Sequence, residues 1–288
     1  ALEIAPDPGE ARDRLYRLAE DHDAWERLAV LYQHAADEAG SAEAAASYLL
    51  EVADIRTRQN RPLETETLYR RILGMRPEDD DARSKLEALY RREERWVDLA
   101  ASLEERTDPR LGSAAPELER PGLLRELADV YQDKLQRPHD AIEALSRLRK
   151  LAPEDIGVLG NMADLHASTG RWSKVIDCLS KIADVADGTS DAREALRRIA
   201  SIYENNLELV DRAVDTYGQI VSQWPDDEDA YEALDRLYEQ NGRWEELSAT
   251  LRRRAALTRD PDSRAELLGR RAKVLLDWLD APDDAAAA

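Results

Sequence analysis

Apolar residues recur along this chain at the spacing of one face of a helix. Between residues 193 and 203, for example, Leu196, Ile199, Ala200 and Tyr203 fall at offsets of 3, 4 and 7. No stretch alternates between apolar and polar residues as a half-buried strand does. The pattern therefore predicts an all-α protein.

Residues that end helices divide this pattern at regular intervals. Prolines, a glycine and an Asn-Gly pair separate the apolar stretches, and several are followed by Asp or Glu in the next helical turn. Fifteen helices are predicted, and the short turns between them favour antiparallel hairpins, which gives seven pairs and one terminal helix. The predicted helices span residues 9–20, 22–37, 42–59, 62–75, 79–92, 94–106, 119–135, 138–151, 155–169, 171–186, 190–206, 209–223, 227–240, 243–257 and 261–279.

The chain also repeats itself. Tryptophans open second helices at nearly equal intervals, at Trp25, Trp96, Trp172 and Trp244. An alanine follows three of them at one fixed distance, but the alanine that follows Trp96 comes later, which indicates an inserted loop at 107–118. Self-similarity at a fixed period is the signature of a solenoid. We expect one solenoid over residues 9–280, with an N-terminal extension at 1–8 and a disordered Ala-rich tail at 281–288.

Three second helices share a further pattern, in which a large residue and then a proline follow at spacings of 4 and 8. The three sets are Thr65, Tyr69 and Pro77; Ala141, Leu145 and Pro153; and Ala213, Tyr217 and Pro225. In these residues the chain resembles the tetratricopeptide repeat (TPR) family, whose period is about 34 residues. The resemblance implies a right-handed superhelical solenoid, in which alanines of the first helices let the paired helix approach closely. These alanines are Ala53, Ala128, Ala163, Ala200 and Ala272. HEAT repeats fit the hairpin length less well.

The charge of the chain narrows the choice of partners. Forty-one basic and 61 acidic residues give a formal net charge of −20. Nucleic acids and anionic membranes both attract basic surfaces, so neither is an expected partner. No apolar run approaches the length of a membrane-spanning helix, so no membrane insertion is predicted. The single cysteine fits a cytoplasmic location, or a periplasmic one if a targeting segment has been removed.

Residue types that carry chemistry are scattered. His166 occupies a position where other repeats have Tyr90 and Tyr238, which favours a packing role. Cys178 is expected at a tolerant, half-buried site with no base beside it. Acidic clusters at 78–81 and 226–229 stand at helix starts, where they complement the positive helix end, and they lack the glycine and spacing of a calcium loop. We therefore predict no catalytic residues, no metal and no cofactor.

The repeated tryptophans are better explained by packing than by binding. Each opens a second helix, usually after an arginine, and the same position recurs in every double unit. A binding role would be confined to one place, so we expect core packing between hairpins, with the arginine stacked on the indole ring.

The resemblance also implies where a partner would lie. TPR ligands usually occupy the concave surface formed by first helices. Arginines on that surface of an otherwise acidic chain are suited to bidentate contacts with carboxylates or phosphates. The predicted partner-binding residues are Arg125, Asp129, Asn161, Arg197, Arg198, Asn205 and Arg236. A carboxylate clamp for a chaperone tail would map onto Arg125, Asp129, Asn161, Glu194 and Arg198, but Asp129 and Glu194 would repel a chain terminus.

The C-terminal helix is a first helix without a second. Leu275, Trp278 and Leu279 are therefore expected to leave an apolar patch that contacts another copy of the chain or a continuing array. The favoured function is a non-enzymatic scaffold or adaptor that binds a protein or peptide on the concave surface. The alternatives are a regulatory or docking module of a larger protein, and an enzyme with an unfamiliar helical active site.

Overall fold

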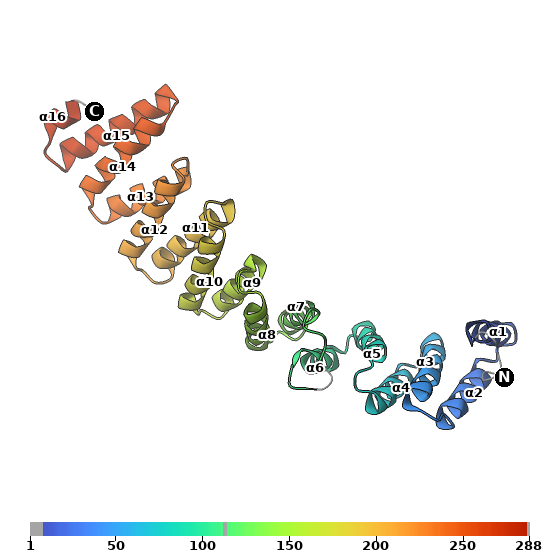
Figure 1. Ribbon diagram of the computed structural model, residues 1–288. Helices are drawn as coiled ribbons and strands as arrows, with labels where there is room; N and C mark the ends of the chain where they lie inside the picture. Colours follow the sequence, from blue (N-terminus) through green and yellow to red (C-terminus); the bar gives the residue numbers. More distant parts are fainter. Residues whose placement is uncertain (1–7, 112–113, 287–288) are drawn as a thin grey trace. The chain divides into compact units, whose positions relative to one another are not determined.

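The computed structural model describes residues 8–111 and 114–286, and the predicted extension falls almost entirely outside this part. The chain divides into unit 1, up to Ala144, and unit 2, from Leu145 onward. Within the described residues the structure contains helices and no strands, which confirms the all-α prediction. Figure 1 shows the helices of each unit in chain order.

The observed helices match the predicted ones to within a few residues. Those that begin in unit 1 are α1 (Pro8–Asp21), α2 (Trp25–Asp37), α3 (Ala42–Arg58), α4 (Pro62–Met75), α5 (Asp80–Arg92), α6 (Trp96–Thr107), α7 (Arg120–Asp129), the π-helix η1 (Val130–Lys134) and α8 (Pro138–Leu151). Those of unit 2 are α9 (Ile156–Ser168), α10 (Trp172–Val185), α11 (Ser190–Asn205), α12 (Val210–Gln223), α13 (Glu228–Gln240), α14 (Trp244–Leu257), α15 (Pro261–Asp277) and α16 (Pro282–Ala286).

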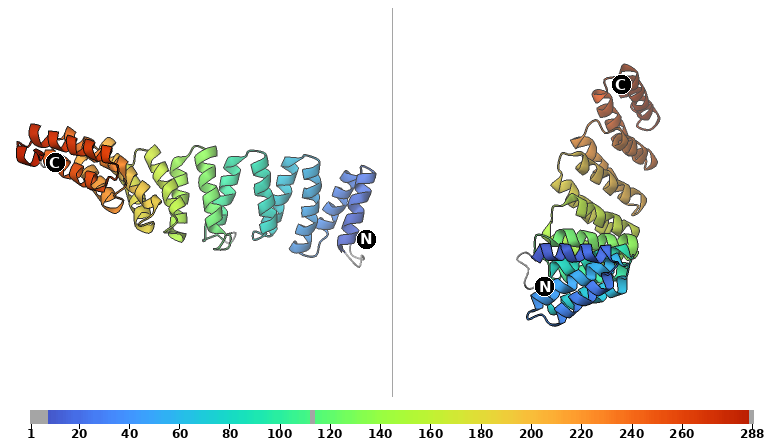
Figure 2. Two further views of the ribbon diagram at one scale, coloured as in Figure 1. Left: turned by 90° about the horizontal axis from the view of Figure 1, so that it is seen from above. Right: turned by 90° about the vertical axis from the view of Figure 1, so that its right-hand side faces the viewer.

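Helices that are consecutive in the chain pack against each other, from α1 to α7 in unit 1 and from α9 to α16 in unit 2. Figure 2 shows these antiparallel neighbours from two further directions. Because each helix buries its apolar stripe on sequence neighbours, the core is a continuous layer along each unit. The layer includes Leu49 and Leu99 in unit 1, and Leu159 and Leu247 in unit 2.

The turn inside each of three hairpins is set by one residue in the left-handed conformation. Gly170 and Gly242 have φ angles of +69° and +66°, and Glu94 takes the same role at +54°. Each is followed by an arginine whose backbone N–H donates to a carbonyl in the preceding helix, at 2.9 Å for Arg95 and Tyr90. This bond satisfies a carbonyl that the end of a helix leaves open. The next helix then starts at once, which explains the tight, uniform hairpins.

Most helices that open the hairpins begin with a side-chain cap, and α7 is the exception among those whose starts are described. Asp79 and Asp227 of the acidic clusters cap α5 and α13, accepting hydrogen bonds from the backbone N–H groups of Ala82 and Ala230 at 3.0 Å. Side-chain caps also begin α3, α9, α11 and α15, whereas α2, α4, α6, α10, α12 and α14 have none. The predicted structural role of the acidic clusters is thus confirmed.

The repeat alanines are buried as expected in four of five cases. Ala53, Ala128, Ala163 and Ala200 are buried, whereas Ala272 is partly exposed near the C-terminal end. The predicted core packing is confirmed for Trp25, which lies against the core cluster of unit 1, but none of the four tryptophans is fully buried. Each stands at the first residue of its helix and is only partly buried, because that position lies at the edge of the hairpin.

The arginines before the tryptophans also have different partners from those expected. Arg95 lies over the ring of Tyr90 at 4.9 Å, and Arg243 lies over Tyr238 at 5.3 Å. The tight turn folds each arginine back onto the end of the preceding helix, so it contacts the tyrosine there and not the adjacent indole ring.

Three further segments differ from the sequence-based expectation. The single helix predicted at 119–135 is α7 followed by the π-turn η1, in which Leu135 N–H donates to the carbonyl of Val130. The inserted loop is anchored where Ala115 N–H donates to the carbonyl of Arg106 at 2.8 Å. The segment expected as a disordered tail includes the short helix α16.

Candidate interaction surface

Ion pairs connect successive odd-numbered helices along unit 2. We call the surface formed by α9, α11, α13 and α15 the odd-helix face. Arg198 of α11 donates to Asp164 of α9 at 2.6 Å, and Arg236 of α13 pairs with Glu204 of α11. The even-numbered helices are the direct packing neighbours of the odd ones, so these links depend on long arginine side chains. Each exposed ion pair contributes little stability by itself, so the pairs together, and not any single one, maintain the spacing of these helices.

The two units are related by the sequence repeat, which gives each position of unit 1 an equivalent in unit 2. Before the inserted loop, the equivalence is fixed by aligning Trp96 with Trp244. After the loop, it is fixed by aligning Ala128 with Ala272.

One ion pair occurs at equivalent positions of both units with its charges exchanged. In unit 1, Arg91 of α5 pairs with Glu126 of α7 at 2.7 Å. Arg91 corresponds to Glu239, and Glu126 corresponds to Arg270. Arg270 pairs with Glu239 at 3.0 Å. The contact between odd-numbered helices is therefore kept although the sign of each partner is reversed.

The residues predicted to bind a partner are divided between the two units. Arg125 and Asp129 lie on α7 in unit 1. Both are exposed, and partial desolvation and the nearby charge of Asp133 raise the pKa of the Asp129 carboxyl. The other predicted residues lie in unit 2: Asn161 on α9, Arg197, Arg198 and Asn205 on α11, and Arg236 on α13.

The unit 2 arginines are engaged with carboxylates of this chain. Arg197 donates to the buried cap residue Asp227 at 2.7 Å, and Arg198 and Arg236 hold the ion pairs described above. The sequence reasoning treated these guanidinium groups as receptors for a partner's acid, but neighbouring repeats already supply the acid. Asn161 is exposed, and Asn205 donates to Ser201 Oγ at 3.1 Å.

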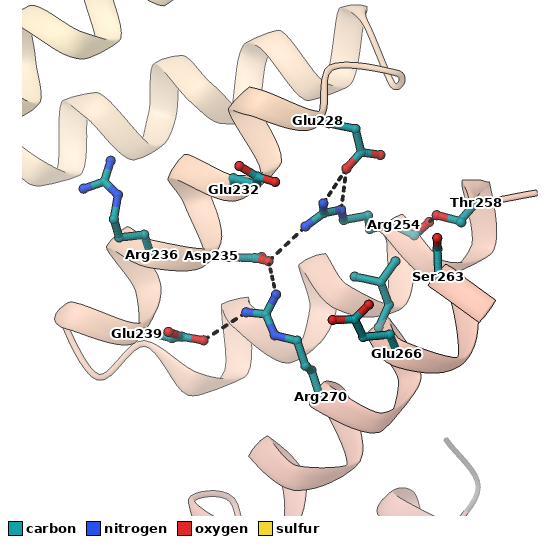
Figure 3. A pocket seen from close by; sticks show the side chains of 11 residues that line it. Glu228, Glu232, Asp235, Arg236, Glu239, Arg254, Thr258, Ser263, Glu266 and Arg270 are labelled. Carbon is teal, nitrogen blue, oxygen red and sulfur yellow. Dashed lines mark hydrogen bonds and ion pairs between the residues drawn. The ribbon is translucent and has the colours of Figure 1, made fainter. Parts of the chain in front are cut away.

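A groove of about 500 Å³ lies on the odd-helix face between α13 and α15 (Figure 3). The side chains that line it come from three helices and from the turn before α15. From α13 they are Glu228, Glu232, Asp235, Arg236 and Glu239; from α14 and the residue after it, Arg254 and Thr258; and from α15, Ser263, Glu266, Leu267 and Arg270. Carboxylates outnumber guanidinium groups in this lining, so the groove is acidic.

Asp235 lies between two arginines at the base of this groove (Figure 3). Its Oδ2 accepts from Arg254 at 3.2 Å and from Arg270 at 3.1 Å, while Oδ1 is buried without a hydrogen-bond partner. Only 4% of the residue is exposed. Burial raises the pKa of the Asp235 carboxyl, and the two arginines oppose that shift.

Of the residues that line this groove, only Arg236 was predicted to bind a partner, and the groove itself was not predicted. One signal was available in the sequence. An acid and an arginine occur at one fixed spacing at Glu87 and Arg106 and again at Asp235 and Arg254, at equivalent repeat positions. The two residues pair in both units, at 3.1 and 3.2 Å, and each is buried except Arg254, which is partly buried.

The other residues considered for chemistry are buried. Cys178 is fully buried, not half-buried as predicted, and burial raises the pKa of its thiol. His166 is also buried, and its pKa is lowered by burial and by the charges of Arg171 and Lys174. Across the described residues, no group of His, Cys, Asp and Glu could hold a metal ion. No described helix has the length and apolar character needed to cross a membrane.

Antiparallel hairpins that pack in chain order and share capping and turn geometry define a helical-repeat protein. Residues 194–227 and 230–265 match family models of the tetratricopeptide repeat. The chain is a TPR-like repeat protein, with its best-defined repeats in the part of unit 2 that forms α11 to α14. No curated protein matches the chain in sequence.

Several solved structures have similar helical arrangements. A tetratricopeptide repeat protein from Parabacteroides merdae is 17% identical, with coverage of 84% of this chain and 89% of that one and a TM-score of 0.38. YrrB, a TPR protein with an unusual peptide-binding site, is 18% identical over 65% of this chain and 91% of its own, with a TM-score of 0.39. MamA AMB-1 is 19% identical over 62% and 93%, with a TM-score of 0.41.

Proposed function

We propose that this protein is a non-enzymatic scaffold or adaptor that binds a protein or peptide partner on the odd-helix face of unit 2. The observation that carries the proposal is the groove between α13 and α15. It lies in and directly beyond the TPR-matched segment, and its volume falls within the usual range for ligand sites. Its lining is polar and charged, which suits an extended peptide better than an apolar small molecule.

The ion pairs between odd-numbered helices support the proposal because they hold the face at a fixed spacing. A surface ordered before binding loses less conformational entropy when a partner docks. Asn161 and Asn205 add exposed amide groups along the same face, and amides both donate and accept hydrogen bonds with a peptide backbone. Binding at Arg198 or Arg236 would require a partner's acid to compete with Asp164 or Glu204.

A peptide library displayed on phage and selected against the full chain tests the proposal. Selected peptides are expected to lose binding when Asn161 and Asn205 are both changed to Tyr, because the larger rings obstruct the odd-helix face. Ser173→Tyr with Gln219→Tyr is the matched control, since both residues are exposed on the even-numbered helices α10 and α12. Circular dichroism checks that both double variants remain helical.

The opposite pattern of loss would contradict the proposal. If peptides lose binding with the α10 and α12 variants and keep it with the α9 and α11 variants, the partner surface is formed by even-numbered helices. A selection that yields no binding peptide would also count against a peptide-binding scaffold.

A further inference from the structure

We propose that the groove between α13 and α15 is a receptor for a basic side chain, an arginine or lysine of a partner polypeptide. The inference deepens the proposed function, on which it rests for the identity of the partner as a polypeptide. The proposed ligand is positively charged, whereas the sequence suggested an acidic partner group. The unit 2 arginines described above already pair with carboxylates of this chain, and two carboxylates of the groove have no such partner among the described residues.

The charges that line the groove do not balance. Arg254 and Arg270 together engage Glu228, Asp235 and Glu239. The remaining arginine, Arg236, pairs outside the groove with Glu204. Glu232 and Glu266 are both exposed and have no ion-pair or hydrogen-bond partner among the described residues. Two carboxylates of the groove lining, one on α13 and one on α15, therefore have no ion-pair partner among the described residues.

The buried acid at the base of the groove gives a second, independent indication. In unit 1 the equivalent acid, Glu87, is fully paired: Oε1 accepts from Ser102 at 2.9 Å, and Oε2 accepts from Arg106 at 3.1 Å. In unit 2 the acid is Asp235, one methylene shorter, and its Oδ1 has no donor. A buried carboxylate oxygen without a donor is costly, so a positive group bound in the groove would stabilise the charged form of Asp235 through space, without a direct bond to Oδ1.

The fold itself does not require the two unpaired carboxylates. By the repeat alignment, Glu232 corresponds to Ser84 and Glu266 corresponds to Gly122 in unit 1. Both of those residues are exposed on helices of the same type, and their hairpins form without an acid there. The acidic pair is therefore a property of this groove and is absent from the equivalent position of the other unit.

A guanidinium or ammonium group matches what the groove offers. A guanidinium presents several N–H donors in one plane and can bond two carboxylates at once. Leu267 also lines the groove and offers apolar surface to the methylene stem of such a side chain. The chain's net charge of −20 would in addition accelerate the approach of a basic segment.

NMR titration of the full chain with two matched peptides tests the inference. The first is a blocked Gly-Gly-Arg-Gly-Gly peptide, and the second has citrulline, a neutral analogue of similar shape, in place of arginine. The arginine peptide is expected to shift backbone amides of α13 and α15 around Glu232 and Glu266 in a saturable way. The citrulline peptide is expected to leave them unchanged.

Two double variants separate a local site from general attraction by an acidic protein. Glu232→Ser with Glu266→Gln, which uses the unit 1 residue at the first position, is expected to weaken the arginine peptide about ten-fold or more. Asp215→Asn with Glu245→Gln removes the same charge from exposed positions on α12 and α14, and it is expected to change binding less than two-fold.

Three results would overturn the inference. They are equal effects of the two double variants, arginine-induced shifts spread over the whole acidic surface, and tighter binding of spermidine than of the arginine peptide at the groove. The last would assign the site to a small polyamine. If the arginine peptide binds the groove but the phage selection yields no peptide, the proposed function fails while the cation site stands. If the selected peptides bind the odd-helix face but contain no basic residues, the proposed function stands and the cation site fails.

Discussion

Trp278 lies flat against Trp244, with ring centroids 4.3 Å apart and ring planes inclined by 13°. The contact joins the end of α15 to the start of α14, the two ends that an antiparallel pair brings together. The expectation of an exposed apolar patch at the end of α15 is wrong for Leu275 but agrees with the exposure of Trp278. Leu275 is only 5% exposed, and the indole of Trp278 has a partner although 60% of the residue remains accessible.

This stacked pair should contribute measurably to the stability of the C-terminal hairpin. Trp278→Ala and Trp244→Ala are each expected to lower the free energy of unfolding by about 1 to 2 kcal/mol. The two effects should be coupled by about 0.5 to 1.5 kcal/mol in a double-mutant cycle, because each substitution removes the same ring contact. Urea unfolding followed by circular dichroism measures both. Strict additivity would show that the rings are neighbours without an energetic interaction.

The exposed apolar surface that remains near Trp278 still predicts self-association. Leu276, two residues earlier in the chain, is 55% exposed, and exposed apolar residues favour contact with another copy. Leu276→Glu is expected to abolish any increase of sedimentation coefficient with protein concentration. Leu209→Glu, an exposed leucine before α12, is the control and should leave association unchanged. A concentration-independent monomer for the unsubstituted chain would contradict the prediction.

The buried pair of Glu87 and Arg106 predicts an asymmetric response to substitution. Arg106→Ala leaves the carboxylate of Glu87, a residue only 1% exposed, without its principal cation, so we expect a loss of about 3 kcal/mol of stability. The double variant Glu87→Leu with Arg106→Met should recover most of that loss, because it removes both charges and the unpartnered Nε of Arg106. Urea midpoints of the three variants provide the test. A double variant less stable than Arg106→Ala would disprove the argument.

His166 should make the stability of unit 2 depend on pH. Its pKa is lowered in the folded protein from the ordinary value of 6.5, so below that value the unfolded chain binds more protons than the folded one. The stabilising effect of the neutral imidazole is therefore present above pH 6.5 and is lost as the pH falls through the folded pKa. His166→Tyr, which restores the tyrosine of the other repeats, should flatten the dependence of unfolding free energy on pH below neutrality. His22→Gln, an exposed control, should keep the original slope.

Much of the fold was predictable because it depends on short-range physics. Apolar spacing, Asp and Ser caps, prolines and the turn before each tryptophan all act within a few residues, so the helices agreed closely with the prediction. The π-turn at 130–134 and the short helix α16 were missed. No local signal distinguishes an i to i+5 bond from an ordinary helical bond at Val130, and the Ala-rich composition of the tail favoured disorder over a single helical turn.

The location of the interaction surface stays a prediction, whereas the ion pairs of its arginines were not predicted. The sequence placed Arg198 and Arg236 on the face of the first helices, but it could not show that Asp164 and Glu204, each on the preceding odd-numbered helix, already bind them. It likewise gave no means of pairing Arg270 with both Asp235 and Glu239. Pairing among many interchangeable charges depends on which long side chains meet when hairpins stack.

The sequence by itself therefore determined the all-α class, the hairpin period and the position of nearly every helix, because these follow from local periodicity and capping. Only the tertiary structure decided which charges are neutralised. Stacking of successive odd-numbered helices brings each arginine to a particular carboxylate and leaves Glu232 and Glu266 unpaired on the groove, among the described residues. Whether a surface charge is available to a partner is a property of distances between repeats, and such distances are set by packing and not by the order of residues alone.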